Sequence, residues 1–237
     1  MRVAARLNSA SLTAASTWAA CLATALSMAL AAPLWAYDAQ LTSAQLHEAW
    51  TLGQRNDQAT SEFLAPYAKQ INSDSANGPH LAEVEVLTPF AQVVDRSKEH
   101  NTGNYTEQQA AQDYKQHGNT VLVRVRLMLP SAFPKQESGP DSAPPPTAEQ
   151  KQAMRPENFW HNFQFHLKQS GKTLTPNSVS NKPIYSAPSK NAASVLDGAT
   201  VWLEYDTKIV ASESATFEIV TPDAKTTSTT FDLQTIR

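Results

Sequence analysis

The stretch Val121-Leu122-Val123-Arg124-Val125-Arg126-Leu127-Met128-Leu129 decides the fold class of this chain of 237 residues. Every second position from Val121 to Leu129 carries Val or Leu, and Arg124 and Arg126 stand between them. This period of two is typical of a strand that turns one face to a core and the other to water, as strands of antiparallel sheets do. The pattern therefore predicts a mainly β protein.

The same alternation recurs along the chain from Leu81 onward. Six of the seven glycines fall at the breaks between the predicted segments, and Gly53 is the exception. Turn residues and period thus agree on where the elements end. Five further segments show the alternation, and we expect each to be a strand: Val84 and Val86; Phe163, Phe165 and Leu167; Val201, Leu203 and Tyr205; Phe217 and Ile219; and Phe231 and Leu233.

Two regions have helical character instead. Residues 42–71 place Leu46, Ala49 and Trp50 at helical spacing behind Ser43 or Thr42, either of which can cap the first turn. One more helix is expected between the early strands, because residues 106–109 (Thr-Glu-Gln-Gln) form a capping box. We therefore predict a short helical N-terminal region over residues 37–80 and an antiparallel β-sandwich over residues 81–237.

Residues 130–156 interrupt the strand pattern. They hold seven of the fifteen prolines and almost no large apolar side chain. Such a segment cannot bury enough surface to order itself, so we expect a mobile Pro-rich loop between two strands. Docking of this segment to a partner is the alternative.

The strand patterns from Val121 to Leu129, from Phe163 to Ser170 with the following Gly171-Lys172, and from Val201 to Asp206 together resemble exported bacterial proteins with an immunoglobulin-like β-sandwich. The resemblance covers roughly residues 81–237. It implies that fold and no activity, because it carries no functional residues with it.

Residues 1–36 have the pattern of an export signal. Arg2 and Arg6 form a basic start, and an apolar stretch from Ala19 to Ala32 is followed by small residues that suit cleavage. We therefore expect an exported protein, either periplasmic or secreted. The sole cysteine, Cys21, lies inside this segment, so the mature protein is expected to have no disulfide.

Two other fates of residues 1–36 remain open. Cys21 follows two alanines, as an acylated cysteine of a lipoprotein would, and a segment left uncleaved would anchor the chain in the membrane. After cleavage, no second long apolar run is present in the sequence, so we expect no transmembrane span in the mature protein.

The charge balance argues against a nucleic-acid partner. The chain has 19 Lys and Arg against 22 Asp and Glu, and the predicted signal removes two arginines and no acid. A mildly acidic protein does not favour a polyanion. An envelope protein or a glycan is the partner we expect, and the sequence leaves the oligomeric state open.

No motif for a cofactor, a metal or a nucleophile is complete. Residues 170–173 (Ser-Gly-Lys-Thr) end like a phosphate-binding loop, but His166 stands where that loop needs glycine, so we predict a hairpin turn. His47-Glu48 begins like a zinc-protease helix, but Thr51 replaces the second histidine. We therefore expect no cofactor and no metal.

The least ordinary feature is a polar face that carries tryptophan. Alternation puts Trp202, Glu204 and Asp206 on one side of their strand, and Trp160 precedes another strand. Three interpretations stand: Trp202 packs beneath the N-terminal helices, lies on a plain surface, or forms a ligand platform with Trp160, Glu204 and Asp206. Charged side chains on comparable faces, which include Glu83, Glu85, Arg124 and Arg126, would pair across the strands.

These observations favour an exported, non-enzymatic binding or accessory module of the bacterial cell envelope. The alternative is a hydrolase that uses a carboxylate pair on envelope or extracellular polysaccharide. Glu204 and Asp206 are the acids to test for it, although two positions on one strand are a poor layout for flanking a glycosidic bond.

Overall fold

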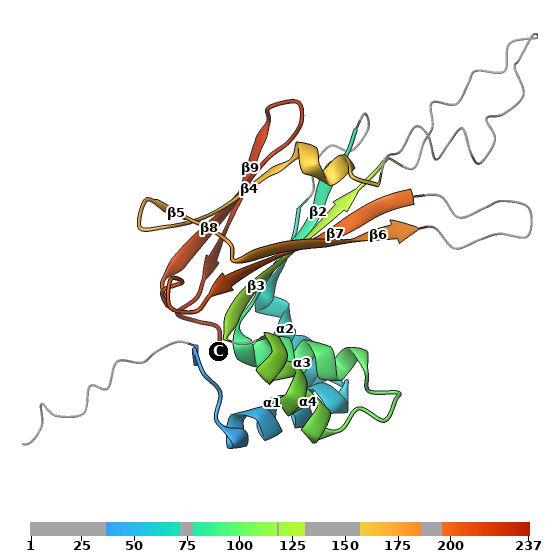
Figure 1. Cartoon of the computed structure of the whole chain (residues 1–237), viewed down its shortest axis with the longest axis vertical. Coiled ribbons are helices and arrows are strands. Elements are labelled where there is room, and N and C mark those ends of the chain that lie inside the picture. Colours follow the sequence, from blue (N-terminus) through green and yellow to red (C-terminus); the bar gives the residue numbers. More distant parts are fainter. Residues whose placement is uncertain (1–36, 72–77, 118, 131–156, 186–195) are drawn as a thin grey trace, which may run out of the picture. The chain divides into compact units, whose positions relative to one another are not determined.

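The computed structural model describes residues 37–71, 78–117, 119–130, 157–185 and 196–237. Within these residues the protein is mainly β, with two antiparallel sheets and four α-helices (Figure 1). The predicted export signal, residues 1–36, and nearly all of the Pro-rich segment 130–156 lie outside the described residues. The prediction of a mainly β, antiparallel protein is confirmed.

The larger sheet has five strands and is built around the stretch that predicted it. β3 (Thr120–Met128) pairs on one side with β2 (His80–Leu87) and on the other with β7 (Leu196–Asp206). β1 (Ala68–Gln70) and β6 (Ser178–Tyr185) form the two edges. In β3 and β7 the buried positions alternate with less buried ones, so the sheet has an inner and an outer face.

The smaller sheet has four strands in the order β5, β4, β8, β9. Residues with positive φ, Ser170 and Gly171, form the turn between its first two strands along the chain, which confirms the predicted hairpin turn. The bounds of these strands are β4 Gln164–Gln169, β5 Lys172–Leu174, β8 Ser214–Val220 and β9 Thr226–Asp232.

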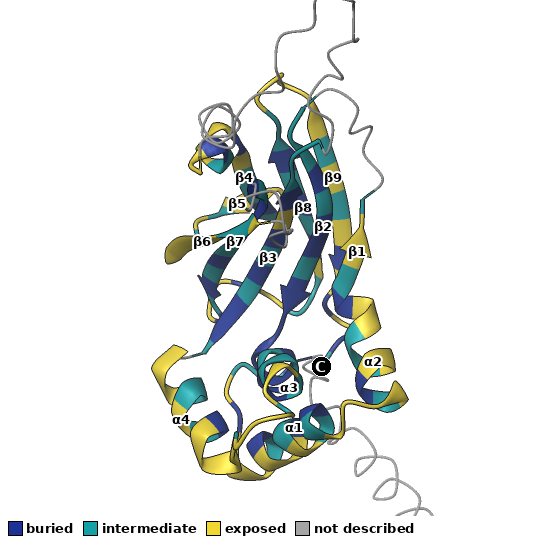
Figure 2. Ribbon diagram, turned by 90° about the vertical axis from the view of Figure 1, so that its right-hand side faces the viewer, coloured by how far each residue is buried: buried dark blue, intermediate teal, exposed yellow. Residues whose placement is uncertain are grey.

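The two sheets share one hydrophobic core. Val123 and Val125 of β3 belong to the same buried cluster as Leu167 of β4, Phe217 of β8 and Phe231 of β9. Burial is concentrated on the inner faces of the strands (Figure 2). Because each strand has period two, one alternation in the sequence specifies both the core and the outer face.

The helices lie together at one end of the sheets (Figures 1 and 2). α1 (Ser43–Arg55) is capped by Thr42, whose side chain accepts from the Gln45 N–H. α2 (Gln58–Leu64) continues into the short 3₁₀ helix η1 (Ala65–Tyr67). A second apolar cluster joins α1 to α3 (Pro89–Glu99) and α4 (Glu107–His117).

Two expectations about the helices were wrong. Helical character was expected as far as residue 71, but residues 68–70 form β1 and pair with β2. Pro66 lies in η1 and cannot donate the next α-helical hydrogen bond, so α2 does not continue through it. One helix was expected between the early strands, whereas α3 precedes α4 there. Thr88 caps α3 and Pro89 occupies its first turn, so the Thr-Pro pair that ends β2 also begins a helix.

Gly53 explains why α1 and α3 lie so close together. A Cβ atom at this position would come within 2.3 Å of the Val94 carbonyl oxygen and 2.6 Å of the Ser97 Cβ. The absence of a side chain therefore permits the backbone of α3 to approach α1. This close approach accounts for the one glycine that stands inside a predicted helix.

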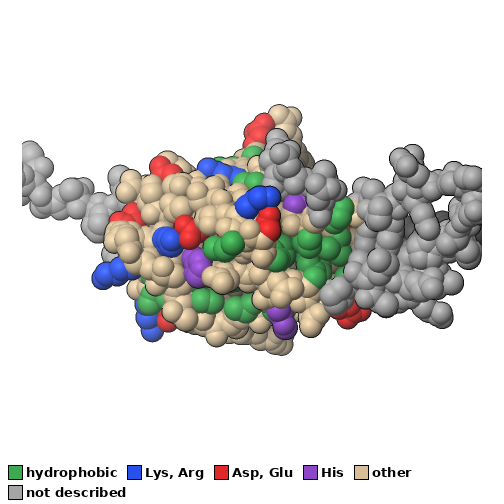
Figure 3. Space-filling view, turned by 90° about the horizontal axis from the view of Figure 1, so that it is seen from above, with side chains coloured by type: hydrophobic (Ala, Val, Ile, Leu, Met, Phe, Trp, Pro, Cys, Tyr) green, Lys and Arg blue, Asp and Glu red, His purple; other side chains and the backbone are tan. Residues whose placement is uncertain are grey.

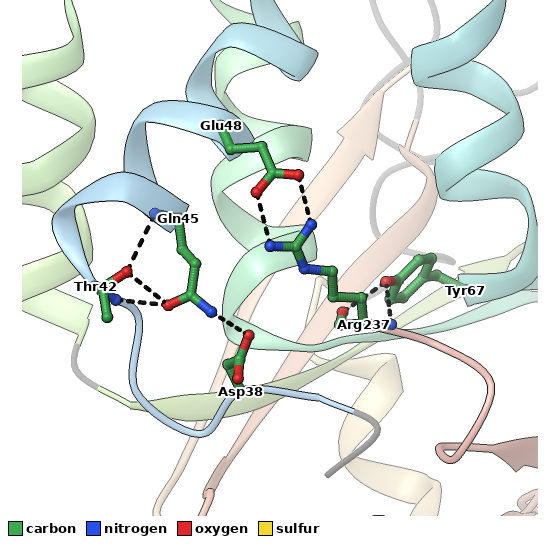
Figure 4. A network of polar contacts seen from close by, with 6 residues as sticks. All are labelled: Asp38, Thr42, Gln45, Glu48, Tyr67 and Arg237. Carbon is green, nitrogen blue, oxygen red and sulfur yellow. Dashed lines mark hydrogen bonds and ion pairs between the residues drawn. The ribbon is translucent and has the colours of Figure 1, made fainter. Parts of the chain in front are cut away.

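Arg237 joins the helices to the sheets (Figure 4). Its guanidinium donates to both carboxylate oxygens of Glu48 in α1, at 2.5 and 2.7 Å, and lies 4.2 Å from the centroid of the Phe90 ring in α3. Its main-chain oxygen accepts from Tyr67 at 2.7 Å and from Thr88. One residue thus contacts α1, η1 and the start of α3.

The edge strands of the two sheets have different surroundings. Lys69 of β1 donates from Nζ to the Thr230 carbonyl of β9 at 2.5 Å, and its ammonium lies 5.2 Å from the Phe231 ring centroid. β1 and β9 are therefore side by side. At the other edge, β6 pairs with β7 alone, most of its residues are exposed, and it contains Pro183.

Among the described residues, no helix has both the length and the apolar composition that a membrane crossing requires.

Candidate functional site

The outer face of the five-stranded sheet carries polar side chains in rows that cross the strands. One row runs Glu85, Arg124, Trp202 and Ser180, and the next runs Glu83, Arg126, Thr200 and Lys182. A third row, toward the helices, runs Leu87, Leu122, Glu204 and Ser178. Each row is set by strand register, so residues as distant in sequence as Glu83 and Glu204 belong to one small area of surface.

α3 and α4 form a wall beside this face. Gln92, Asp95, Arg96 and Glu99 of α3 repeat at spacings of three and four, which puts them on one side of the helix. The opposite side of α3 is apolar and packs into the helical cluster. Gln92 holds the helix to the sheet by donating from Nε2 to the carbonyls of Leu87 and Thr120.

Two adjoining clefts lie between this wall and the sheet. The larger has a volume of about 330 Å³ and reaches under α4, and the smaller, of about 240 Å³, extends over the row of Arg126 and Lys182. Both are lined by Glu99, Arg124 and Trp202. We call the two together the Trp202 cleft. The larger one alone has the volume of a small-ligand site.

The floor of the Trp202 cleft is an arginine held by three carboxylates. Arg124 contacts Glu85, Asp95 at 2.8 Å and Glu99 at 3.6 Å. Burial opposes the charge on the guanidinium, but the hydrogen bonds and charges of Glu85 and Asp95 outweigh burial, so the pKa of Arg124 lies above its usual value. Arg124 is therefore a fixed cation whose charge is already balanced by carboxylates of the protein.

The neighbouring row has a different balance. Arg126 lies 3.2 Å from Glu83, its directly opposite partner across β2 and β3, as the predicted cross-strand pairing requires. Lys182, on the edge strand, has no hydrogen-bond or ion-pair partner among the residues described. The Trp202 cleft thus has a free ammonium group at its open side.

A chain of polar contacts links α3 and α4 to β7. Arg96 lies 3.2 Å from Asp113 and 3.1 Å from Nε2 of His117, whose Nδ1 lies 4.0 Å from Glu204. Because arginine only donates, Nε2 of His117 accepts, which leaves the proton on Nδ1, the atom that faces Glu204. Ser178 donates to the other carboxylate oxygen of Glu204 at 2.9 Å.

Tyr105 lies in the segment between α3 and α4 and lines the larger cleft. Its hydroxyl donates to Asp113 at 2.9 Å. Burial, followed by the hydrogen bond and charge of Asp113, raises the pKa of Tyr105, so the hydroxyl keeps its proton and remains a donor. Asp113 is consequently shared by Tyr105 and Arg96, and this fixes α4 against α3.

The four predicted site residues lie in three different places in the structure. Trp202 and Glu204 both line the Trp202 cleft, the former half-buried at the junction of its two parts. Asp206 is on the same side of β7 but accepts from the Lys208 N–H at 2.9 Å, so it caps the turn after the strand. Trp160 lies in η2 (Phe159–Asn162), packs against the sheet core and contacts His161 edge-on.

Trp160 and Trp202 are therefore not part of one platform, because Trp160 packs against the shared core and Trp202 lies on the outer face. The interpretation that packs Trp202 beneath the N-terminal helices does not match the lining of the cleft. The helices beside it are α3 and α4, and not those of the N-terminal region.

Sequence reasoning missed the residues that α3 and β6 bring to the cleft. Asp95, Arg96 and Glu99 come from a helix that was not expected, and Ser180 and Lys182 come from a strand with no clear alternation. A signal for α3 was present, since Thr88-Pro89 has the form of a helix cap and first turn.

Two other surfaces are separate from this cleft. On the four-stranded sheet, Lys168 pairs with Glu218 at 2.9 Å in another cross-strand contact. At the end of the sheets away from the helices, hydrophobic side chains gather beside residues that are not described (Figure 3). The Trp202 cleft lies nearer the helical end.

Within the described part of the chain, no group of three or more His, Asp or Glu side chains is arranged to hold a metal ion. What the Trp202 cleft offers chemically is a flat aromatic surface with hydrogen-bond donors and acceptors around it. Such a set orients a polar ligand that also has an apolar face.

No model of a protein family matches the chain, and no curated protein matches it.

Proposed function

We propose that the protein is a non-enzymatic binding or accessory module of the bacterial cell envelope and that its ligand occupies the Trp202 cleft. The observation that carries the proposal is the position of Trp202, which is shared by two adjoining clefts on a sheet face where both arginines are ion-paired. A half-buried indole at the centre of a cleft supplies contact area at little entropic cost.

The finer description of the fold belongs to this proposal. Two antiparallel sheets around one core support an immunoglobulin-like sandwich, in which residues 81–237 form the domain and the helices at 37–67 pack on it. The pattern of residues 1–36 supports export to the periplasm or the medium.

Binding is favoured over hydrolysis by the disposition of the acids. Asp206 caps a turn, and Glu204 is bonded to Ser178, so the two carboxylates named for a hydrolase do not face one another across the cleft. The other acids of the cleft are held by arginines. A carboxyl group that acts as a general acid needs burial or a neighbouring carboxylate to raise its pKa, whereas an arginine partner favours the ionised form.

The test of binding uses protein purified from cells that express the full chain. It is incubated with peptidoglycan sacculi, chitin and cellulose, and both retention of the protein and release of soluble sugar are measured. We expect retention without release, and we expect Trp202→Ala to abolish retention while Trp160→Phe does not. Trp160 is the control because it packs against the core and lies outside the cleft. Sugar release that Glu204→Gln abolishes would contradict the binding proposal and support the hydrolase.

The test of export is the mass of the mature protein. We expect a start after Ala31 or Ala36, because small residues end the apolar stretch there. Tyr37 is buried and donates to the Val210 carbonyl, so the described fold begins immediately after this segment. A mature protein that starts at an acylated Cys21 would overturn simple export and establish a lipid anchor.

A further inference from the structure

We infer that the ligand of the Trp202 cleft is an uncharged saccharide, with one sugar ring stacked on the Trp202 indole between Glu204 and Lys182. This inference rests on the proposed function and names the chemistry of its ligand. It follows from the charges that remain after the ion pairs of the cleft are counted, from the free hydrogen-bonding groups and from their spacing on the sheet.

Most charges of the cleft cancel within the protein. Arg126 is paired with Glu83, Arg96 with Asp113, and Arg124 with Glu85, Asp95 and Glu99. The carboxylates of the two clefts outnumber the Lys and Arg side chains by six to four. An anionic ligand would meet this acidic excess and find each arginine already bonded, so polyphosphates and nucleic acids are disfavoured.

The groups that remain free include both donors and acceptors. The indole N–H of Trp202, the hydroxyl of Ser180 and the ammonium of Lys182 have no partner among the residues described. Glu204 keeps one oxygen that has only the distant Nδ1 of His117 beside it, at 4.0 Å. Vicinal hydroxyl groups, which both donate and accept, satisfy such a mixed set, whereas an apolar ligand would leave it unpaired.

The spacing of these groups fits one ring. Glu204 and Thr200 lie two residues to either side of Trp202 on the same face of β7, which is about 7 Å along the strand in each direction. Lys182 is directly opposite Thr200, and Ser180 is directly opposite Trp202 on the edge strand. A ring stacked on the indole would therefore have a carboxylate at one end and an ammonium group at the other.

A charged ligand fits this arrangement less well. A zwitterion, such as a peptide terminus, could meet Glu204 and Lys182, but their charges belong to rows separated by the indole. The binding of a peptide there would depend on both charges and would weaken in salt. The binding of a neutral sugar depends on hydrogen bonds and stacking, so salt and loss of formal charge affect it little.

This difference defines the experiment. Protein purified from cells that express the full chain is titrated calorimetrically with chitohexaose, cellohexaose and maltohexaose, and with a mixture of short zwitterionic peptides as the comparison. We expect at least one oligosaccharide to bind and the peptides not to bind. Raising the ionic strength about tenfold should change the dissociation constant less than about threefold.

Three variants refine the result. Trp202→Ala should weaken binding about tenfold or more, because stacking is lost. Glu204→Gln should keep most of the affinity, since an amide still accepts hydrogen bonds, whereas Glu204→Ala should lose it. Trp160→Phe is the matched control outside the cleft. Near-ultraviolet circular dichroism shows whether each variant has retained its fold.

The outcomes separate the inference from the proposed function. Trp202-dependent binding of a peptide, with strong salt dependence and loss in Glu204→Gln, would overturn the saccharide inference and leave the binding module standing. Oligosaccharide binding that Trp202→Ala leaves unchanged would overturn the assignment to this cleft. If no oligosaccharide, peptide or envelope polymer binds, the proposed function fails together with the inference.

Discussion

Arg237 and Glu48, 189 positions apart, form a bidentate ion pair between the last residue of the sequence and α1. The planar guanidinium also covers the Phe90 ring. Planar, two-pronged contact is available to arginine and not to lysine. The pair therefore fixes α1 relative to the start of α3.

We expect Arg237→Ala to lower the free energy of unfolding by about 1–2 kcal/mol, from an exposed but bidentate pair and a cation–π contact. Urea denaturation at neutral pH measures it. Arg237→Lys should recover less than half of the loss, and equal stability of Lys and Arg variants would contradict the geometric argument.

The pair also predicts a pH dependence. The hydrogen bond from Arg237 lowers the pKa of Glu48, so its stabilising contribution is complete above the ordinary glutamate pKa of 4.5 and is lost as the pH falls through the lowered value. The stability difference between wild type and Glu48→Gln should consequently shrink at acid pH. Denaturation curves at about pH 7 and about pH 3 test it.

At Gly53 we predict a substitution effect opposite to the one that helix propensity alone would give. Alanine is ordinarily about 1 kcal/mol better than glycine inside a helix. At Gly53 the added Cβ would overlap the Val94 carbonyl oxygen at 2.3 Å, so we expect Gly53→Ala to destabilise the protein by about 2 kcal/mol or more. Gly103→Ala, where the nearest atom is 3.6 Å away, is the control and should change stability by less than about 0.5 kcal/mol. Thermal unfolding of the two variants compares them.

Arg124 and Arg126 are neighbours on one strand with different surroundings. The Arg124 side chain is 21% exposed among three carboxylates, and that of Arg126 is 52% exposed beside one. We expect Arg124→Met to cost about 3 kcal/mol, because it leaves half-buried acids without a cation, and Arg126→Met to cost less than about 1 kcal/mol. Similar losses in both variants, measured by urea denaturation, would show that the carboxylates around Arg124 do not depend on it.

The buried tyrosines predict a loss of stability in alkali. Burial raises the pKa of Tyr37 to about 12, from an ordinary value of 10.0, and Tyr67 is raised to the same value. The folded state therefore holds these protons more tightly, so their contribution is complete below about pH 10 and declines as the pH rises toward 12.

Tyr37→Phe should make this decline shallower by up to about 1.4 kcal/mol per pH unit, since one titrating group is gone. The unfolding free energy at about pH 9 and about pH 11 gives the slope. A slope unchanged by the substitution would mean that Tyr37 ionises at its ordinary pKa in the folded protein.

The sequence predicts those parts of the fold in which local pattern and environment agree. In β3 the alternation from Val121 to Leu127 was sufficient because one side of the strand meets the core. The predicted start of α4 was confirmed because Thr106 and Gln109 satisfy each other's N–H groups locally.

The parts that were missed depend on contacts distant in sequence. β6 has no alternation, since as an edge strand it is exposed on most positions, and it is ordered by its pairing with β7. α3 begins with a proline that equally marks the end of a strand. The period of two placed Trp202 and Glu204 on one face of their strand. Strand register, which the sequence pattern does not show, puts Ser180 and Lys182 beside them. Asp95 reaches the cleft because a helix begins after Thr88.

The contact of Lys69 with Thr230 has a consequence for assembly at high concentration. An unpaired strand is a template on which further copies can add into fibrils. Lys69 joins β1 to β9, so two of the four terminal strands of the sheets shield each other. Of the other two, β5 has three residues and β6 contains Pro183, which cannot donate a main-chain hydrogen bond to an incoming strand. These features are ones by which edge strands resist the addition of further copies. We therefore expect Pro183→Val, in the longer of the two remaining edge strands, to increase aggregation at high concentration.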